Sequence, residues 1–575
     1  MKKFTYWMVG ILLGFTAIPA AFGSETGKAE VRSIAQNPVN LRGSDVAGIQ
    51  LFGNRSLNLM GDVGMLQESA SVMPLEKRGT YRLPRKVANT AELAGTYVLT
   101  YKSLASSIAA GGRDCEIAPV EGKDSITISN FWDKGVVLKA GVDLATGRIS
   151  IPNQVLATTE NYGDIDFATC LQNGTPDRSA PVTGKITEDG MIVIDGWWGV
   201  YVVSGENKDG MFGAYYETEI EKANGEMGFT TLDGQSDKYG VIVTQTSANV
   251  VTVKNFANYG KTVEILLSRD ERGTITSQLA REDKTNGDWY TFATTYKTDG
   301  SLEGYAADIT LDKSTDKRKL TWGNWTLMNV GGTKKYYLGA RDTGYITTPF
   351  DIEYPTLSVT EFEGEGTESS PYLIKKLDDL ILLSDRVNEV TDYPYTNGMS
   401  NYARVFLGKF FRLENDIDMT GYRFEPIGNR WSNVFAGSFD GNGKTIKGLT
   451  VSTGANGYAA LFGLTDTLSV IKDLRITNAE ISSADYYAAA IVGWSRGTIE
   501  NCHVSDSHIY NTGLAAAALA GISTTIRGCS SVGNQIEGLG GFAAGVAGEV
   551  DGSITDCFAE KTVIYAGAVA EGYPS

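Results

Sequence analysis

A five-residue block rich in alanine and ending in glycine returns about every 28 residues near the C-terminus, and it constrains the fold more than any other feature. The copies are AALFG (459–463), AAIVG (489–493), AALAG (517–521) and AGVAG (544–548). Each copy is followed by a second short match: Ile471-x-x-Leu474, Ile499-x-x-Cys502, Ile526-x-x-Cys529 and Ile554-x-x-Cys557. A fixed period of this size is typical of stacked repeat units, so these residues predict a solenoid rather than a globular enzyme core.

The second match predicts a column of side chains inside the solenoid. Equivalent residues of a parallel β-helix stack about 4.8 Å apart. The column would contain Leu474, Cys502, Cys529 and Cys557. Because a free cysteine behaves as a small buried apolar residue, and a leucine holds the same place, we interpret this ladder as structural. A metal site would need converging tetrahedral ligands and usually a C-x-x-C pair, and the sequence has neither.

The segment before the repeats carries further marks of the same architecture. It contains Ser370-Pro371-Tyr372, an i, i+3, i+4 apolar pattern from Leu377 to Val387 that predicts one amphipathic helix, and FDGNGKTI at 439–446. With the glycine-ended blocks, these motifs resemble GLUG-motif proteins, which are bacterial surface and secreted proteins, some of them adhesins and some IgA-specific metallopeptidases. The resemblance covers 358–575. It implies a right-handed parallel β-helix capped by the α-helix, and no activity by itself.

A second, more divergent repeat fills residues 91–350. ITISNFWDKG (126–135) matches VTVKNFANYG (251–260) at an offset of 125. We expect two modules, 91–220 and 221–352, each built of short alternating strands that form a closed barrel or a sandwich. They resemble lipocalin-like modules in exported proteins of Bacteroides-type bacteria. The predicted fold class is all-β: two tandem antiparallel β-barrel or sandwich modules, then the parallel β-helix with one capping α-helix.

Two cysteines lie in the first module, Cys115 and Cys170, whereas the second module has none. A disulfide would leave this pattern, because its partners are retained or lost together, and an exported protein permits one. The sequence therefore predicts a Cys115–Cys170 bridge, with two buried free thiols as the alternative.

Four tryptophans of the modules are the candidates for ligand binding: Trp197, Trp198, Trp322 and Trp325. Exposed aromatic rings stack on sugar rings, whereas buried ones fill a barrel. The two pairs hold similar places in the two modules, which favours the structural role. Adjacent strand residues face opposite sides, so one of Trp197 and Trp198 should lie outside the core and is the better candidate for a contact surface.

The N-terminus predicts export. Met1-Lys2-Lys3, a short apolar run and small residues before Gly23 are typical of a secretory signal peptide (1–23). Residues 24–90 predict a flexible leader. The net charge of −17 disfavours nucleic acid and anionic membrane as partners, and no later apolar run of about 18 residues predicts a membrane span. We expect a cell-surface or extracellular protein, with the periplasm as an alternative.

Few residues are suited to catalysis. The two histidines, His503 and His508, both lie in the repeats, so the modules cannot hold a Ser/His/Asp triad. Cys502 and His503 should point to opposite faces, and no H-E-x-x-H motif is present, so the metallopeptidase activity of some GLUG relatives is not expected. We expect the charged residues of the coils to be scattered rather than to form a column of like carboxylates. We predict no catalytic residue, no cofactor and no metal.

These observations favour an exported, non-catalytic bacterial surface or secreted protein. It would act as an adhesin or bind glycan, mucin or a host matrix protein, with the β-helix as stalk or recognition face. A polysaccharide-degrading enzyme on the β-helix and a structural spacer of a larger surface protein are the alternatives. The chain ends at Ser575 within a coil that has only begun, which predicts that the natural polypeptide continues.

Overall fold

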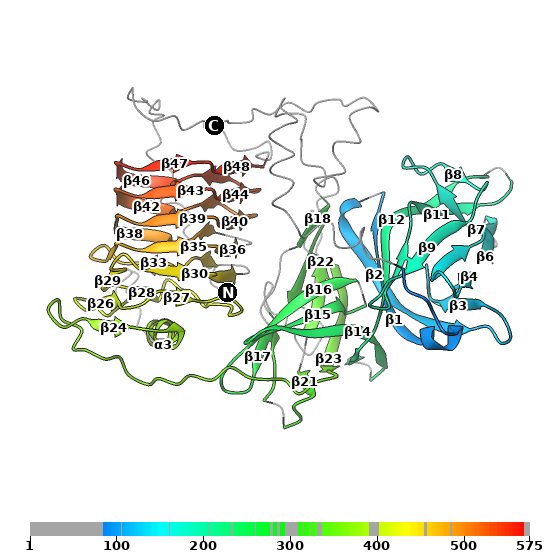
Figure 1. Cartoon of the computed structure of the whole chain (residues 1–575), viewed down its shortest axis with the longest axis horizontal. Coiled ribbons are helices and arrows are strands. Elements are labelled where there is room, and N and C mark those ends of the chain that lie inside the picture. The colour runs from blue at the N-terminus through cyan, green and yellow to red at the C-terminus, as the bar shows by residue number, and fades with distance from the viewer. Residues whose placement is uncertain are drawn as a thin grey trace, which may run out of the picture.

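The computed structural model describes residues 84–567, apart from 105, 160–161, 206, 232–233, 259, 276–279, 284–287, 294–308, 314, 324, 330–335, 390–401, 454–456 and 484–485. The predicted signal peptide, most of the predicted leader and the chain end at Ser575 lie outside these residues. The described chain is almost all β structure, with two barrels and a solenoid side by side along the long axis (Figure 1). The all-β fold class predicted from the two repeats is confirmed.

The first barrel closes on itself. Its strands are β1 (Gly95–Ser103), β2 (Ser106–Pro119), β3 (Ser125–Ser129), β4 (Val137–Asp143), β5 (Arg148–Ile151), β6 (Gln154–Thr159), β7 (Gly163–Cys170), β8 (Pro176–Asp177), β9 (Val182–Ile186), β10 (Ile192–Ile194), β11 (Trp198–Val202) and β12 (Met211–Lys222). An antiparallel ring runs β1-β2-β3-β4-β5-β9-β10-β12, and β12 pairs back onto β1. Closure leaves no free strand edge within the ring, so the module is a barrel and not a sandwich.

The last residues of the predicted leader lie on this barrel. Pro84 forms a β-bridge with Thr187, and the Arg85 amide donates to the Ile186 carbonyl at 2.8 Å. The 3₁₀ helix η2 (Thr90–Leu93) follows, and its Leu93 is buried in the barrel core. Residues 84–90 are therefore hydrogen-bonded to the barrel.

The second barrel repeats the strand order of the first. Its strands are β13 (Gly225–Thr231), β14 (Ser236–Ser247), β15 (Val250–Phe256), β16 (Lys261–Leu267), β17 (Gly273–Ile275), β18 (Ala280–Asp283), β19 (Asp288–Ala293), β20 (Ile309–Thr310), β21 (Lys319–Trp322), β22 (Trp325–Asn329) and β23 (Tyr336–Thr347). They run β18-β19-β22-β23-β13-β14-β15-β16-β17-β20, with β21 paired to β23. A backbone hydrogen bond from Asp312 to Thr321 (2.8 Å) links the ends of β20 and β21 and nearly completes the ring.

The solenoid is built from parallel strands. They are β24 (Tyr372–Ile374), β25 (Ala403–Val405), β26 (Phe410–Leu413), β27 (Ile417–Asp418), β28 (Asn433–Phe435), β29 (Ser438–Asp440), β30 (Thr445–Lys447), β31 (Thr450–Thr453), β32 (Tyr458–Ala459), β33 (Phe462–Thr465), β34 (Val470–Lys472), β35 (Arg475–Thr477), β36 (Glu480–Ser483), β37 (Tyr487–Ala489), β38 (Val492–Glu500), β39 (His503–Ser505), β40 (His508–Asn511), β41 (Ala515–Ala517), β42 (Ala520–Arg527), β43 (Ser530–Val532), β44 (Gln535–Gly538), β45 (Phe542–Ala544), β46 (Ala547–Thr555), β47 (Phe558–Glu560) and β48 (Val563–Ala566). Equivalent strands of successive coils pair to form four sheets. One of these sheets runs β31-β36-β40-β44-β48 and is described further below.

Left-handed residues turn each coil at two corners. At the first corner they are Asp473, Asn501, Gly528 and Asp556, with φ between 51° and 63°. At the second they are Gly448, Asn478, Asp506, Gly533 and Lys561, with φ between 51° and 69°. Gly, Asn and Asp tolerate this conformation best, and they hold all but one of these places. The corner residue directs the next side chain inward, and at the first corner that side chain is Leu474 or a cysteine.

The cysteine column also provides hydrogen-bond acceptors for backbone amides. Leu474, Cys502 and Cys529 are buried. The Cys502 amide donates to the Cys529 sulfur at 3.3 Å, and the Cys529 amide donates to the Cys557 sulfur at 3.4 Å. Each thiol thus accepts a corner amide from the neighbouring coil. At the second corner, oxygens play the same part: the Ala479 amide donates to Ser507 Oγ and the Ser507 amide to Asn534 Oδ1, both at 2.9 Å.

The repeated glycines allow close contact between coils. A Cβ added to Gly521 would lie 2.4 Å from Tyr487 Cβ and 2.6 Å from the Gly493 carbonyl oxygen. A Cβ added to Gly493 would lie 2.9 Å from Tyr458 Cβ. No side chain fits at these distances, so the glycine that closes each block lets the previous coil lie across it.

One helix covers the first coil, as the apolar pattern predicts. It is α3 (Leu377–Asn388), and its Leu380, Leu383 and Val387 are buried in the solenoid core. The Asp379 carboxylate accepts the Lys375 amide at 2.8 Å and so satisfies an amide at the helix start. At the other end, the Asn388 side chain accepts the Gly428 amide at 3.1 Å. The apolar end of the stack is thereby closed.

A clamp joins the second barrel to the solenoid. The Asn249 side chain donates to the Arg423 carbonyl at 2.8 Å and accepts the Arg423 amide at 2.9 Å. The Ala248 amide donates to the Gly421 carbonyl at 3.0 Å. The Arg423 guanidinium, with 8% of its side chain exposed, pairs with Glu264. Burial lowers the pKa of Arg423 to about 10, which still leaves it protonated at neutral pH.

The thiol column predicts different costs for two substitutions of Cys529. Cys529→Val removes the sulfur that accepts the Cys502 amide, and a buried amide without a partner costs about 1–3 kcal/mol. Cys529→Ser keeps an acceptor, as Ser507 does at the other corner, so its loss should be smaller. Urea unfolding followed by circular dichroism gives both free energies. Equal losses, or a neutral valine, would contradict the role of the thiol as an acceptor.

The clamp predicts that Asn249→Ala uncouples the second barrel from the solenoid. The variant leaves two buried backbone groups of Arg423 unpaired, at about 1–3 kcal/mol each. Asn224→Ala is the matched control, because the Asn224 side chain bonds in the same way to Val243 inside the barrel (2.7 and 3.0 Å). Calorimetry should resolve separate transitions for Asn249→Ala only, and small-angle scattering should show that variant expanded. Identical behaviour of the two variants would refute the clamp.

Candidate functional site

An aromatic cluster lies on the outside of the solenoid and is the first candidate site. We call it the aromatic face, and it comprises Tyr402, Trp431, Tyr458, Tyr486, Tyr487 and Trp494. Trp431 has 45% of its surface exposed, whereas Tyr458 and Tyr487 are buried beneath it. Tyr402, Tyr486 and Trp494 are half-buried, so the cluster presents one exposed indole surrounded by partly accessible rings.

The repeat places these rings. Trp494 directly follows the AAIVG block and points outward from β38, and its equivalents in neighbouring coils are Leu464 and Ile522. Tyr458 and Tyr487 come one and two residues before their blocks and are paired in register on β32 and β37. Stacking therefore brings residues from successive coils onto one surface.

The rings contact one another at steep angles. Trp431 and Trp494 have centroids 4.5 Å apart with planes at 80°, and Trp431 lies 6.0 Å from Tyr458 at 90°. Tyr458 and Tyr486 are stacked at 5.2 Å and 13°. Tyr458 and Tyr487 also contact Trp494, and each such contact contributes about 0.5–1.5 kcal/mol, so the buried tyrosines orient the exposed Trp431 and the half-buried Trp494.

Polar groups border the aromatic face. Arg496 donates to the Tyr402 hydroxyl at 2.6 Å, and that hydroxyl donates to the Asp466 carboxylate at 3.0 Å. Arg404 pairs with the same carboxylate, which is fully buried. Burial alone would raise the pKa of Asp466, but the hydrogen bonds from Arg404, the Leu468 amide and Tyr402 outweigh it and lower the pKa. The border thus holds an ionised carboxylate and two guanidinium groups at the edge of the rings.

The tryptophans predicted from the sequence lie elsewhere. Trp198, Trp322 and Trp325 are buried in the two barrel cores, as the structural role favoured by the sequence requires. Trp198 and Trp325 hold equivalent places on β11 and β22, whereas Trp322 fills space above Gly344, where a Cβ would lie 2.3 Å from the ring. Trp197 faces outward as expected, and it stacks on Tyr216 with centroids 4.1 Å apart. Trp197 and Tyr216 thus form a half-buried pair outside the core.

The predicted Cys115–Cys170 bridge is absent. Both thiols are free and buried. Cys115 lies in the main core of the first barrel, and Cys170 lies in a separate cluster with Tyr201 and Ala214. Burial raises the pKa of both thiols, so they stay protonated. The alternative, two buried free thiols, is the one the structure contains.

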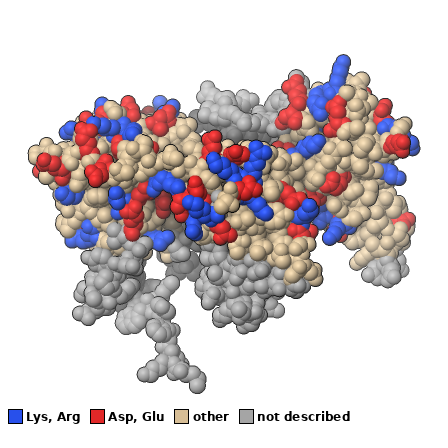
Figure 2. Space-filling view, turned by 90° about the horizontal axis from the view of Figure 1, so that it is seen from below, with Lys and Arg blue, Asp and Glu red and all other residues tan. Residues whose placement is uncertain are grey.

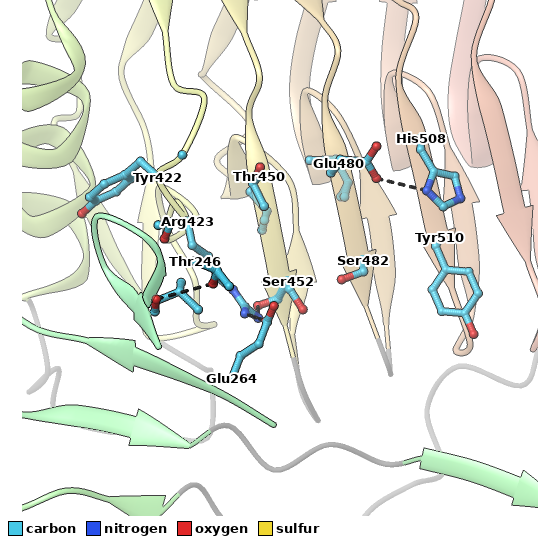
Figure 3. A pocket seen from close by; sticks show the side chains of 15 residues that line it. Thr246, Glu264, Tyr422, Arg423, Thr450, Ser452, Glu480, Ser482, His508 and Tyr510 are labelled. Atoms are coloured by element: carbon cyan, nitrogen blue, oxygen red, sulfur yellow. Dashed lines mark hydrogen bonds and ion pairs between the residues drawn. The ribbon is translucent and has the colours of Figure 1, made fainter. Parts of the chain in front are cut away.

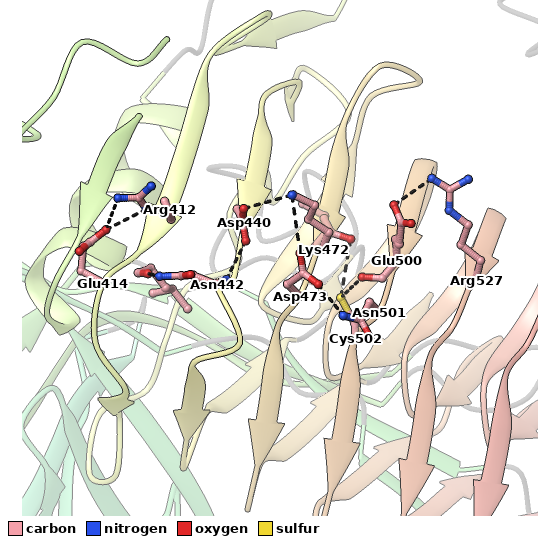
Figure 4. A network of polar contacts seen from close by, with 12 residues as sticks. Arg412, Glu414, Asp440, Asn442, Lys472, Asp473, Glu500, Asn501, Cys502 and Arg527 are labelled. Atoms are coloured by element: carbon pink, nitrogen blue, oxygen red, sulfur yellow. Dashed lines mark hydrogen bonds and ion pairs between the residues drawn. The ribbon is translucent and has the colours of Figure 1, made fainter. Parts of the chain in front are cut away.

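The charged residues of the coils are not all scattered, and that expectation is wrong in part. One column runs in register through five coils: Arg412, Asp440, Lys472, Glu500 and Arg527 (Figure 4). Its signs alternate, with Lys472 3.1 Å from Asp440 and Arg527 2.8 Å from Glu500. Opposite charges on adjacent strands stabilise the stack, and each of these carboxylates already has a cationic partner.

Like charges do not gather on the face shown in Figure 2, where Lys and Arg alternate with Asp and Glu over the described surface. Within the described part of the chain, no group of three or more His, Cys, Asp or Glu is placed to hold a metal ion. His503 is half-buried and lies 2.7 Å from Ser530 Oγ, on the opposite side of its strand from the cysteine column. No helix among the described residues is long and apolar enough to cross a membrane.

A polar cavity of about 430 Å³ is the second candidate site (Figure 3). It lies between the second barrel and the sheet that contains β31, β36 and β40, directly beside the clamp. His508 Nδ1 is 3.1 Å from Glu480 at one wall, and Arg423 pairs with Glu264 at the other. The cavity was invisible to sequence reasoning because its walls come from segments more than 150 residues apart.

The aromatic face was also missed, although the sequence carried a signal for it. Trp431 and Trp494 are the two tryptophans outside the barrels and the signal peptide. Trp494 follows a block glycine, and Tyr458, Tyr486 and Tyr487 precede blocks. The period that aligned Cys502 with Cys529 therefore also aligned these rings on the outer surface.

His508 predicts a loss of solenoid stability at alkaline pH. Hydrogen bonds with Glu480 and then Glu537 raise its pKa to about 9 from 6.5, against the effect of burial. A raised pKa stabilises the fold fully below about pH 6.5, and this contribution disappears as pH rises through about 9. Melting temperatures of wild type should fall across that range more steeply than those of His508→Gln. Parallel pH profiles for the two proteins would contradict this assignment.

Comparison with known proteins finds only partial similarity. No family model matches the chain. Halomucin of Haloquadratum walsbyi is 30% identical over 151 residues, which cover 24% of this chain and 2% of halomucin. A protein of Evansella cellulosilytica described as a Gly-rich membrane protein is 30% identical over 149 residues, 24% of this chain and 15% of that protein. The chain thus spans a small fraction of the length of either relative. A solved structure described as an immunoglobulin A1 protease of Bacteroides ovatus has 23% identity, covers 36% of this chain and 64% of its own, and gives a TM-score of 0.28.

Proposed function

We propose that this protein is an exported, non-catalytic surface protein of the GLUG type that binds glycan chains through the aromatic face of its solenoid. The single observation that carries the proposal is the exposed Trp431 held against Trp494, with Arg496 and Tyr402 at the border. Mucin and host matrix glycoproteins are the carriers of such glycans that we expect.

The chemistry of the aromatic face suits a sugar. The C–H faces of a sugar ring are apolar and weakly positive, and they pack on the negative face of an indole. The hydroxyl groups of the same ring need hydrogen-bonding partners, and the guanidinium groups of Arg404 and Arg496 at the border can donate to them. Because the tyrosines beneath fix both indoles, little side-chain freedom is lost on binding.

Surface location is supported from three sides. The predicted signal peptide directs export, although it lies outside the described residues. The motifs of 358–575 resemble those of bacterial surface proteins. One partial relative is described as a membrane protein.

Two alternatives are less well supported. A polysaccharide-degrading enzyme would need a carboxylic acid free to give up or take a proton, and the carboxylates of the charged column are paired with lysine or arginine. A structural spacer would have no use for an exposed tryptophan cluster.

The proposal predicts that loss of the exposed rings abolishes glycan binding. Trp431→Ala and Trp494→Ala should each weaken binding on a glycan and mucin array by about tenfold or more, because a central indole contributes about 2 kcal/mol or more. Trp197→Ala, which removes the half-buried tryptophan of the first barrel, is the matched control and should bind as wild type.

The same array separates the alternatives. Retained glycans of unchanged length support binding, whereas new reducing or unsaturated ends would establish an enzyme. If the protein binds none of the glycans, the alternative function of a structural spacer is favoured. Equal binding by wild type and both solenoid variants would refute the aromatic face as the site.

A further inference from the structure

The cavity between the second barrel and the solenoid is lined by hydroxyl-bearing residues interspersed with apolar ones (Figure 3). The hydroxyl-bearing residues are Thr246, Ser247, Thr450, Ser452, Ser482 and Tyr510, and the apolar ones are Val250, Val451 and Ile481. Its volume of about 430 Å³ is within the range of ordinary ligand pockets. Hydroxyl groups both donate and accept hydrogen bonds, and apolar side chains between them can pack on C–H groups, which suits a sugar because it carries both kinds of group.

The four charged side chains that line the cavity form two pairs of opposite charge. Arg423 pairs with Glu264, and His508 lies 3.1 Å from Glu480. Since the pKa of His508 is raised to about 9, the imidazole is cationic at neutral pH. The lining therefore carries two positive and two negative groups. A charged ligand would have to compete with a pair that is already formed, whereas an uncharged one would not.

The solenoid wall repeats along one direction. Thr450, Glu480 and His508 occupy one column of successive coils, and Ser452, Ser482 and Tyr510 occupy the next column but one. Equivalent groups on neighbouring parallel strands are about 4.8 Å apart. A linear polymer lying along the coil axis would meet a new polar group at each coil, and a compact ligand would not use this repetition.

The opposite wall is held in place by the clamp. Asn249 and Ala248 hydrogen-bond to the backbone of Arg423 and Gly421, and Gly421, Tyr422 and Arg423 themselves line the cavity. The site is therefore formed before any ligand arrives, which reduces the entropy lost on binding.

We infer that this cavity is a second binding site, separate from the aromatic face, for an uncharged linear oligosaccharide that lies along the coil axis. The inference does not depend on the proposed function, because the two sites share no residue. Hydroxyls of both walls contact the sugar hydroxyls, and the ion pairs at the two walls stay intact.

Titration calorimetry of the full chain tests this with neutral hexasaccharides (maltohexaose, cellohexaose, xylohexaose) and, as the charged comparison, hexagalacturonate. At least one neutral hexasaccharide should bind, and hexagalacturonate should bind more weakly. Ser482→Trp fills the cavity from the solenoid and should lower the association constant by about tenfold or more. Ser505→Trp changes a half-buried serine of β39 outside the cavity and should leave it within about twofold.

Several outcomes would overturn the inference. They are no binding of any neutral hexasaccharide at about 10 mM, tighter binding of hexagalacturonate, or unchanged binding by Ser482→Trp. If Ser482→Trp fails to fold, Thr246→Trp fills the cavity from an exposed position near the end of β14 and is judged in the same way. Trp431→Ala should bind the hexasaccharide normally, and loss of binding in that variant would assign the sugar to the aromatic face instead.

Discussion

The parallel hydrogen-bonded register between successive coils is the constraint on which the solenoid depends. It requires each coil to turn at the same places, which left-handed residues such as Asn501 and Gly528 make possible. It also leaves the corner amides without strand partners. The sulfur of Cys529 and the oxygens of Ser507 and Asn534 accept those amides from the neighbouring coil. The thiol of Cys529 and the side-chain amide of Asn534 thus serve the same purpose at two corners of one coil.

The same register organises the outer surface. The charged column alternates in sign because residues in register are forced within reach of one another, and like charges there would repel. The aromatic face arises in the same way, with Tyr458, Tyr487 and Trp494 brought together by stacking. A repeat that exists to satisfy backbone amides therefore also builds an extended surface, which is the surface we assign to glycan.

Sequence reasoning succeeded where a period was present. The block spacing predicted the solenoid and the inward column beginning at Leu474, because both follow from the backbone repeat, and the i, i+3, i+4 apolar pattern predicted the capping helix α3. The 125-residue offset likewise predicted two barrels. It favoured a structural role for Trp198 and Trp322 but could not place them in the core, because an aromatic residue on a strand is compatible with either the core or the surface until the neighbouring strands are known.

The sequence by itself determined the architecture of each body, since periodicity and turn residues act locally and repeat along the chain. Only the tertiary structure decided which surfaces meet. The contact of Asn249 with Arg423 closes one wall of the polar cavity, and the approach of Trp431 to Trp494 builds the aromatic face. The repeat places Trp494 on the outer surface, but Trp431 and Asn249 belong to no repeated position, so their contacts are set by the shapes and charges of complete folded surfaces.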